Sequence, residues 1–317
     1  MVFASGSGWV VRCFAMVGVA LLVSFPVRSQ DLEPRLYQNA PIGLNAIILG
    51  YGFSSGNVLF DTALLIEDAT ADVHVVLFAY LRTFDFFGRS AKFDVVLPFS
   101  DANFQGFLDG EFRTRNPTGI ADPRVRLAVN LIGSPPLTGA EFKNYRQKTI
   151  VGASLQVAVP LGQYDNTKLL NLGANRWSFR PEIGVSRSLG RWFLEMAGGG
   201  WFFATNNDFF GGSTFEQKPL LFIKGDAIYN FRPGLWLSFN FGIANGGETT
   251  INGDFKANPQ RNARLGSTLS IPFAPHNSLK IVYTSGLVTR LGADFDSISV
   301  VYQYTWGNTP GAEPAGN

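Results

Sequence analysis

The fold is indicated most clearly by residues 124–131, which read RVRLAVNL. Apolar residues take every second position, at Val125, Leu127, Val129 and Leu131, and polar or small residues lie between them. A period of two residues is that of a β-strand, whose successive side chains point to opposite faces. One face of this strand therefore meets an apolar medium, while arginine side chains occupy the other face.

The same alternation recurs along the chain and predicts twelve strands in all. The expected strands cover residues 43–51, 72–83, 91–99, 123–132, 149–161, 176–187, 192–203, 220–231, 235–244, 263–273, 279–285 and 297–306. Successive amphipathic strands with charged residues on the polar face are typical of an all-β, antiparallel up-and-down barrel with lipid outside and water inside. In the second strand we assign Val73, Val75 and Leu77 to the lipid face and His74 to the lumen.

The connections between the expected strands alternate in length. Those after odd-numbered strands are long and polar or rich in glycine, whereas those after even-numbered strands are mostly tight. Bacterial outer-membrane barrels have short periplasmic turns and longer extracellular loops, so the alternation orients the barrel. The exception is the connection 133–148, in which residues 138–147 predict a short helix. Aromatic residues near strand ends, Trp192 and Trp236 among them, predict the two interfacial girdles.

Composition and the N-terminal residues fit export to the outer membrane of a Gram-negative cell. Only 16% of the 317 residues are charged, against about 25% in soluble domains. Residues 1–29 predict a secretory signal peptide, because Arg12 precedes an apolar run from Cys13 to Phe25. The expected organisation is a signal peptide at 1–29, a short N-terminal segment at 30–42, the barrel at 43–306 and a flexible tail at 307–317.

Several partner classes are not supported by the residues. Loss of Arg12 and Arg28 with the signal peptide leaves 24 basic and 24 acidic residues, and this balance argues against nucleic acid. The sole cysteine, Cys13, leaves with the same peptide, which removes any thiol ligand or disulfide. The two histidines, His74 and His276, lie about 200 residues apart, and we expect neither a metal nor a cofactor. Outer-membrane lipid and a small solute remain as expected partners.

The inward-facing charges are the main candidates for function. We expect the following residues to line the lumen and set its selectivity: Arg124, Arg126, Arg180, Glu182, Glu195, Lys224, Asp226 and Arg264. The four arginines fall in the outer half of the lumen, where a basic vestibule would attract anionic solutes. Alternatively, the same charges form arginine–carboxylate pairs that brace the barrel and leave no open pore. Both interpretations remain open because about twelve strands enclose only a narrow interior.

Three runs in the centre of the chain resemble a known family. They are GIADPR at residues 119–124, VPLGQYD at 159–165 and NLGANRWSFRPE at 171–182. These runs resemble the bacterial outer-membrane transporter family of the MetA pathway of phenol degradation, and the resemblance extends over about residues 43–306. It implies a barrel that passes small molecules, aromatic ones among the candidates, and it implies no catalytic residues.

The sequence therefore predicts an outer-membrane channel or uptake protein, not an enzyme, that passively admits small aromatic or anionic molecules through a polar, arginine-lined lumen. One alternative is an outer-membrane lipid hydrolase in which His74 acts beside a serine at the edge of the lumen. A second is a structural or adhesive barrel with a blocked lumen, in which the loops 100–122 and 245–262 act. A third is a soluble secreted β protein.

Overall fold

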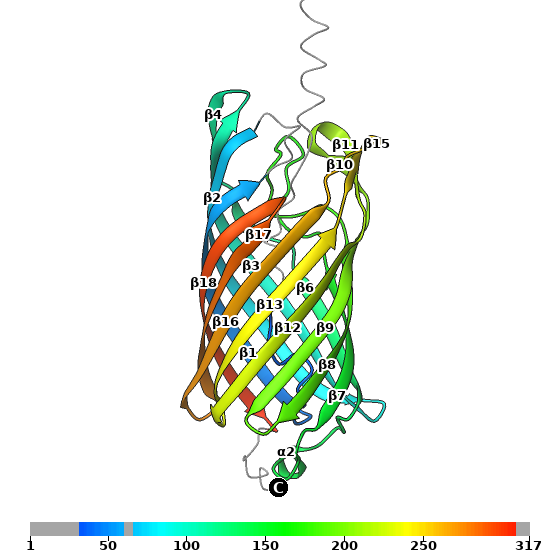
Figure 1. The fold of residues 1–317 in the computed structure, drawn as a ribbon, viewed down its shortest axis with the longest axis vertical. Helices are drawn as coiled ribbons and strands as arrows, with labels where there is room; N and C mark the ends of the chain where they lie inside the picture. The colour runs from blue at the N-terminus through cyan, green and yellow to red at the C-terminus, as the bar shows by residue number, and fades with distance from the viewer. Residues whose placement is uncertain (1–31, 60–65, 309–317) are drawn as a thin grey trace, which may run out of the picture.

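The computed structural model describes residues 32–59 and 66–308, which form a closed β-barrel (Figure 1). The barrel strands are β1 (Leu44–Leu59), β2 (Ile66–Phe86), β3 (Arg89–Leu108), β6 (Arg124–Ile132), β7 (Thr149–Ala158), β8 (Ser178–Leu189), β9 (Trp192–Phe203), β12 (Leu220–Arg232), β13 (Leu235–Gly246), β16 (Gln260–Ala274), β17 (Asn277–Thr289) and β18 (Gly292–Gly307). Each is antiparallel to the next, and β1 also pairs with β18, which closes the sheet. The predicted twelve-stranded antiparallel barrel is confirmed.

The two ends of the barrel differ in the way the alternating connections predict. Tight turns and the short helix α2 (Gly139–Phe142) lie at one end, at the bottom of Figure 1. The opposite end carries the small strands and the 3-10 turn of the long connections, namely β4 (Glu111–Arg115), β5 (Thr118–Ile120), β10 (Asn206–Phe209), η1 (Phe210–Gly212), β11 (Ser213–Gln217), β14 (Thr249–Ile251) and β15 (Asp254–Phe255). We assign the turn end to the periplasm. No helix in the described part of the chain is long and apolar enough to cross a membrane.

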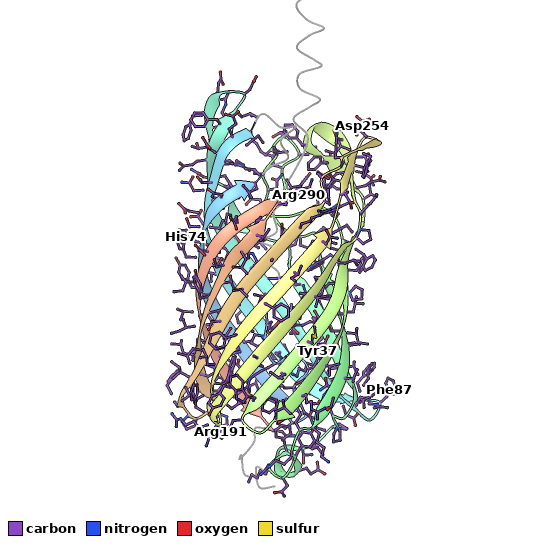
Figure 2. All side chains as sticks on the ribbon, in the orientation of Figure 1. Tyr37, His74, Phe87, Arg191, Asp254 and Arg290 are labelled. Carbon is purple, nitrogen blue, oxygen red and sulfur yellow. The ribbon has the colours of Figure 1, made fainter. Side chains whose placement is uncertain are left out.

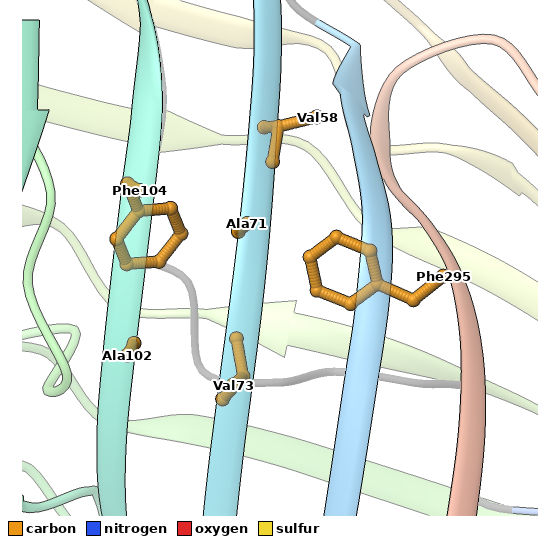
Figure 3. Close-up of a cluster of buried hydrophobic side chains, with 6 residues drawn as sticks. All are labelled: Val58, Ala71, Val73, Ala102, Phe104 and Phe295. Carbon is orange, nitrogen blue, oxygen red and sulfur yellow. The ribbon is translucent and has the colours of Figure 1, made fainter.

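The first three strands extend further on the extracellular side than the sequence predicts. Residues 100–108, expected in a loop, continue β3, which then turns back through β4. A buried apolar cluster explains the extension. Inward side chains of β1, β2, β3 and β18 pack together in the extracellular part of these strands (Figure 3). Its members are Val58, Ala71, Val73, Ala102, Phe104 and Phe295. Continued side-chain packing allows the ladder of backbone hydrogen bonds to continue.

Side chains alternate between the lumen and the outer face along the barrel strands. In β8 the exposed residues Phe179, Ile183 and Val185 alternate with the buried residues Arg180 and Glu182. Exposed apolar side chains form a band around the barrel, as lipid contact requires.

The predicted orientation of β2 is wrong. His74, Val76 and Phe78 lie on the outer face, whereas Val75 and Leu77 face the lumen. Residues at both the odd and the even positions of this strand are apolar over most of its length, so the pattern of alternation could not distinguish its two faces. Pairing with β1 and β3 decides the orientation instead. One consequence is that part of the lumen wall is apolar.

We predict that Ile183→Arg lowers the free energy of unfolding by about 2–4 kcal/mol, because it places a charge on the lipid face near the middle of β8. Denaturant titration of the protein refolded into lipid vesicles measures the change. Asn103→Arg is the matched control, since Asn103 is exposed on the extension of β3 beyond the apolar band, where the effect should be small. Equal destabilisation by both substitutions would contradict the assigned lipid boundary.

Candidate functional site

The N-terminal segment of the described chain, residues 32–42, runs from the interior of the barrel to its turn end, where Asn39 and Ile42 bond to the connection 133–148. It is called the lumen segment below. Tyr37, which is 1% exposed, is enclosed by the barrel walls, and Figure 2 labels it in the lower half of the molecule. Leu32 reaches Gly266 of β16, on another side of the lumen. The sequence predicts a short segment before the barrel but does not show that it occupies the lumen.

Tyr37 fills a hollow made by small residues of the wall. Gly152 of β7 and Gly184 of β8 are directly paired. A Cβ atom would lie 2.3 Å from the tyrosine ring at Gly152 and 2.2 Å from it at Gly184. Ala197 of β9 packs against the same ring. The hydroxyl of Tyr37 donates a hydrogen bond to Oε1 of Glu182 at 3.0 Å. These contacts fix the ring both sterically and through a polar anchor.

Arg35 provides the second attachment of the lumen segment. Its backbone N–H donates to Oε2 of Glu195 at 2.9 Å, and its guanidinium lies 4.5 Å from the ring centroid of Trp236. Lys92 of β3 donates from Nζ to the carbonyl oxygens of Arg35 and Leu36, at 3.1 and 2.7 Å. The sequence-based assignment of Trp236 to the interfacial girdle is wrong, because its side chain is 5% exposed and lies in the lumen under Arg35.

Glu33 provides the third attachment through an ion pair. Its Oε2 lies 2.7 Å from Nη1 of Arg126, and Nε of the same arginine donates to Oδ2 of Asp94 at 2.8 Å. Arg126 and Asp94 are buried, whereas the Glu33 side chain is 51% exposed, toward the lumen cavity that it lines. Burial within the barrel would raise the pKa of Glu33, but attraction by Arg126, Lys224 and Lys280 lowers it to about 2. Glu33 is therefore ionised at neutral pH.

A second group of charges braces the wall at β8 and β12. Nη2 of Arg180 lies 3.0 Å from Oε2 of Glu182, and Nζ of Lys224 lies 3.1 Å from Oε1 of the same carboxylate. The guanidinium of Arg180 also lies 4.5 Å from the centroid of the Phe222 ring. Three of the predicted lumen residues thus come together, with the carboxylate of Glu182 paired with both cations.

The other predicted lumen residues have different surroundings. Glu195 and Asp226 are opposite each other on β9 and β12, and Asp226 accepts a hydrogen bond from Nδ2 of Asn240. Arg264 donates from Nη2 to two carbonyl oxygens of β18, at 3.3 and 3.5 Å. Of the eight predicted residues, Arg124 and Arg126 line the lumen cavity described next. The structure therefore does not gather the predicted arginines into one basic vestibule.

A cavity of about 380 Å³ lies inside the barrel and is bordered by the lumen segment. The lining contributed by β1, β2, β3, β17 and β18 is mostly apolar, and this apolar wall contains Ile48, Val75, Leu77, Ala79, Val96, Pro98, Val282 and Val301. Serine and threonine side chains of the same strands, namely Ser54, Ser100, Thr284, Ser297 and Ser299, also line the cavity. Charged groups of the cavity come from β3, β6, β17, the lumen segment and the connection before β6, and they are Glu33, Asp94, Asp122, Arg124, Arg126 and Lys280. Sequence analysis did not reveal this apolar wall, because it assigned Val75 and Leu77 of β2 to the lipid face. A solute in this cavity would meet both kinds of surface.

Asp122 holds a long extracellular connection over this cavity. Its Oδ1 accepts from the backbone N–H of Gly162 at 3.0 Å, and its Oδ2 accepts from the N–H of Ala174 at 2.8 Å. Gly162 and Gly173 touch, since a Cβ on Gly162 would lie 2.7 Å from Cα of Gly173. Leu172, in the same connection, is buried and lines the cavity. The quoted central sequence runs thus encode an inward-folded loop.

His74 is not placed as the hydrolase alternative requires. It lies on the outer face of β2, where Nδ1 is 2.7 Å from the hydroxyl of Tyr51 and the ring lies 4.9 Å from that of Phe53. The expectation of a lumen-facing His74 is wrong for the same reason as the orientation of β2. Among the described residues, no three His, Cys, Asp or Glu side chains are grouped in a way that could hold a metal ion.

Comparison with known proteins supports the architecture. The family model described as "Putative MetA-pathway of phenol degradation" matches residues 52–300. The COG4313 outer membrane channel from Pseudomonas putida F1 is 20% identical, with a TM-score of 0.73 over 87% of this chain and 100% of that chain. The β domain of the Bordetella autotransporter BrkA is 9% identical, with a TM-score of 0.47 over 83% of this chain and 100% of that chain. No curated protein matches the chain.

We predict that Gly184→Ala releases the lumen segment, because the new methyl group would overlap the ring of Tyr37 in a closely packed interior. Release is measured by maleimide labelling of a Gln38→Cys variant in a Cys13→Ser background, since Gln38 is buried when the segment is docked. Labelling should become several-fold faster.

Gly198→Ala is the matched control for this experiment, because a Cβ at Gly198 has no neighbour closer than 3.6 Å. Its labelling rate should equal that of the parent. Unchanged labelling in Gly184→Ala would show that Tyr37 does not occupy this hollow in the membrane.

Proposed function

We propose that this chain, which belongs to the MetA-pathway phenol-degradation family, is an outer-membrane channel that passively admits small solutes with an apolar body. The observation that carries the proposal is the cavity of about 380 Å³ inside the barrel, whose mostly apolar lining includes a few charged groups. Binding sites for small molecules are commonly apolar cavities that contain a few polar groups. The sequence has no nucleotide-binding motif, so movement would follow the solute gradient.

The apolar wall favours solutes that carry a ring or an alkyl group. Burial of apolar surface contributes about 25 cal/mol per Å², so a ring that buried about 100 Å² against Val75, Leu77 and Val282 would gain about 2.5 kcal/mol. That gain exceeds RT several times, yet it still permits dissociation. A wholly hydrophilic solute would gain nothing from this wall. The expected cargo is therefore amphipathic rather than simply anionic.

The predicted charged residues take two roles in this proposal. Arg124 and Arg126 line the cavity, and we assign selectivity to them. Arg180, Glu182 and Lys224 brace the wall beside Tyr37 instead. Passage to the periplasm requires the lumen segment to move, and its polar contacts with the wall can exchange for contacts with water.

The structural barrel with a blocked lumen is the second candidate. It is favoured by one observation, which is that most of the inward charges are already paired and the lumen segment docks through Glu33, Arg35 and Tyr37. In that case the cavity is a packing defect rather than part of a pathway. The two candidates differ in whether any solute crosses the barrel.

Solute entry into vesicles containing the purified protein tests the proposal. We predict that Leu77→Ser lowers the rate for phenyl glucoside relative to glucose several-fold, because it makes the apolar wall polar. Leu97→Ser is the matched control, since Leu97 lies at a similar height in the barrel but faces outward. If neither solute enters vesicles carrying the parent or the Gly184→Ala variant, the channel is rejected in favour of the blocked barrel.

A further inference from the structure

The carboxylate of Glu33 occupies a distinctive position in the cavity. It belongs to the lumen segment rather than to the wall, and it lies 2.7 Å from Nη1 of a buried wall arginine, Arg126. Asp94 engages Nε of that guanidinium and holds its orientation, so that Nη1 is directed to Glu33. Glu33 and Arg126 both line the cavity. A carboxylate outside the strand ladder thus pairs with an arginine of the wall beside the cavity.

We propose that Arg126 is the binding site for the carboxylate group of a solute, and that Glu33 occupies this site when the lumen segment is docked. The inference rests on the proposed channel function, and it adds the class of solute: a small monocarboxylate with an apolar body. Guanidinium groups bind carboxylates through directed, charge-assisted hydrogen bonds. One carboxylate can replace another at Nη1 of Arg126 without rearrangement of the wall.

The charges around the cavity favour this exchange. Arg124, Arg126 and Lys280 line it together with Glu33, Asp94 and Asp122. Asp94 is bound to Arg126, and Asp122 accepts from the backbone N–H groups of Gly162 and Ala174. When Glu33 leaves, the positive charge near Arg126 is no longer balanced. Charges inside a barrel interact more strongly than charges in bulk water, so an incoming anion would be attracted. Neutral solutes of the same shape lack this attraction.

The apolar wall determines the rest of the solute. The cavity that contains Arg126 also contains the side chains of Val75, Leu77 and Val282. A molecule with one carboxylate and one ring could meet both surfaces at once. A second carboxylate on the ring would have to lose water against an apolar wall, which is unfavourable without a partner. Aromatic monocarboxylates are therefore the favoured class.

Competition at Arg126 couples solute binding to movement of the lumen segment. A bound carboxylate removes the Glu33 attachment and leaves the contacts of Arg35 and Tyr37. By thermodynamic linkage, any change that weakens docking must strengthen carboxylate binding, and the converse holds as well. The solute would thus loosen the segment that obstructs its own path.

Calorimetric titration of the purified full chain in detergent, with benzoate as the probe and benzamide as its neutral counterpart, tests the proposal. Glu33→Gln should raise the affinity for benzoate about tenfold, because it removes an internal competitor held by a charge-assisted hydrogen bond. Affinity for benzamide should not change. Glu67→Gln is the matched control, since Glu67 lies on the extracellular extension of β2 and does not line the cavity. Heat-modifiable gel migration checks that each variant is folded.

Labelling of the Gln38→Cys variant provides a second measurement in the same background. Benzoate should accelerate maleimide labelling several-fold, whereas benzamide should not. The inference is overturned if Glu33→Gln leaves the benzoate affinity unchanged, or if benzamide gains as much as benzoate. These outcomes are separate from those of the vesicle experiment. If phenyl glucoside enters the vesicles but benzoate does not compete with Glu33 for Arg126, only the carboxylate site is rejected. If benzoate competes with Glu33 but no solute enters the vesicles, only the channel is rejected.

Discussion

Closure of the sheet by the pairing of β1 with β18 is the constraint on which the rest of the structure depends. A bilayer offers no partner for an unpaired backbone N–H or C=O group, so a lipid-exposed sheet must have no open edge. Closure at twelve strands also sets the width of the interior. Eight strands enclose a space that wall side chains can fill, and a barrel of twelve is wider. The chain fills part of the additional width with its own residues 32–42.

The lumen segment and the wall fit each other through residue size. Inward glycines at positions 152 and 184 make room for the ring of Tyr37, and alanine at 197 completes the hollow. The cavity lies beside this segment and is bordered by its residues Leu32, Glu33 and Pro34. The width set by twelve strands thus leaves room for both the lumen segment and the cavity.

The architecture was predictable because contact with lipid requires an apolar residue at every second position of a spanning strand, as at Val125, Leu127 and Val129. The prediction failed in β2, where His74 is flanked by apolar residues on both parities and only pairing with β1 and β3 determines which face is inside. The lumen segment was not predictable from local pattern, because its partners are distant in sequence, as in the contacts of Arg35 with Glu195 and of Tyr37 with Glu182, which lie 160 and 145 residues apart. The inward pair of glycines at 152 and 184 is the signal that could have indicated a bulky occupant.

The inward charges divide into two classes with different consequences. Pairs within the wall, such as Arg180 with Glu182, join residues whose positions are fixed by the strand ladder, so they persist as long as the barrel does. Pairs between the wall and the lumen segment, such as Arg126 with Glu33, can be exchanged without breaking a strand pairing. A passive channel has no energy source with which to open. Its movable parts must therefore be held by contacts that a solute can replace, and the contacts of the lumen segment meet that requirement.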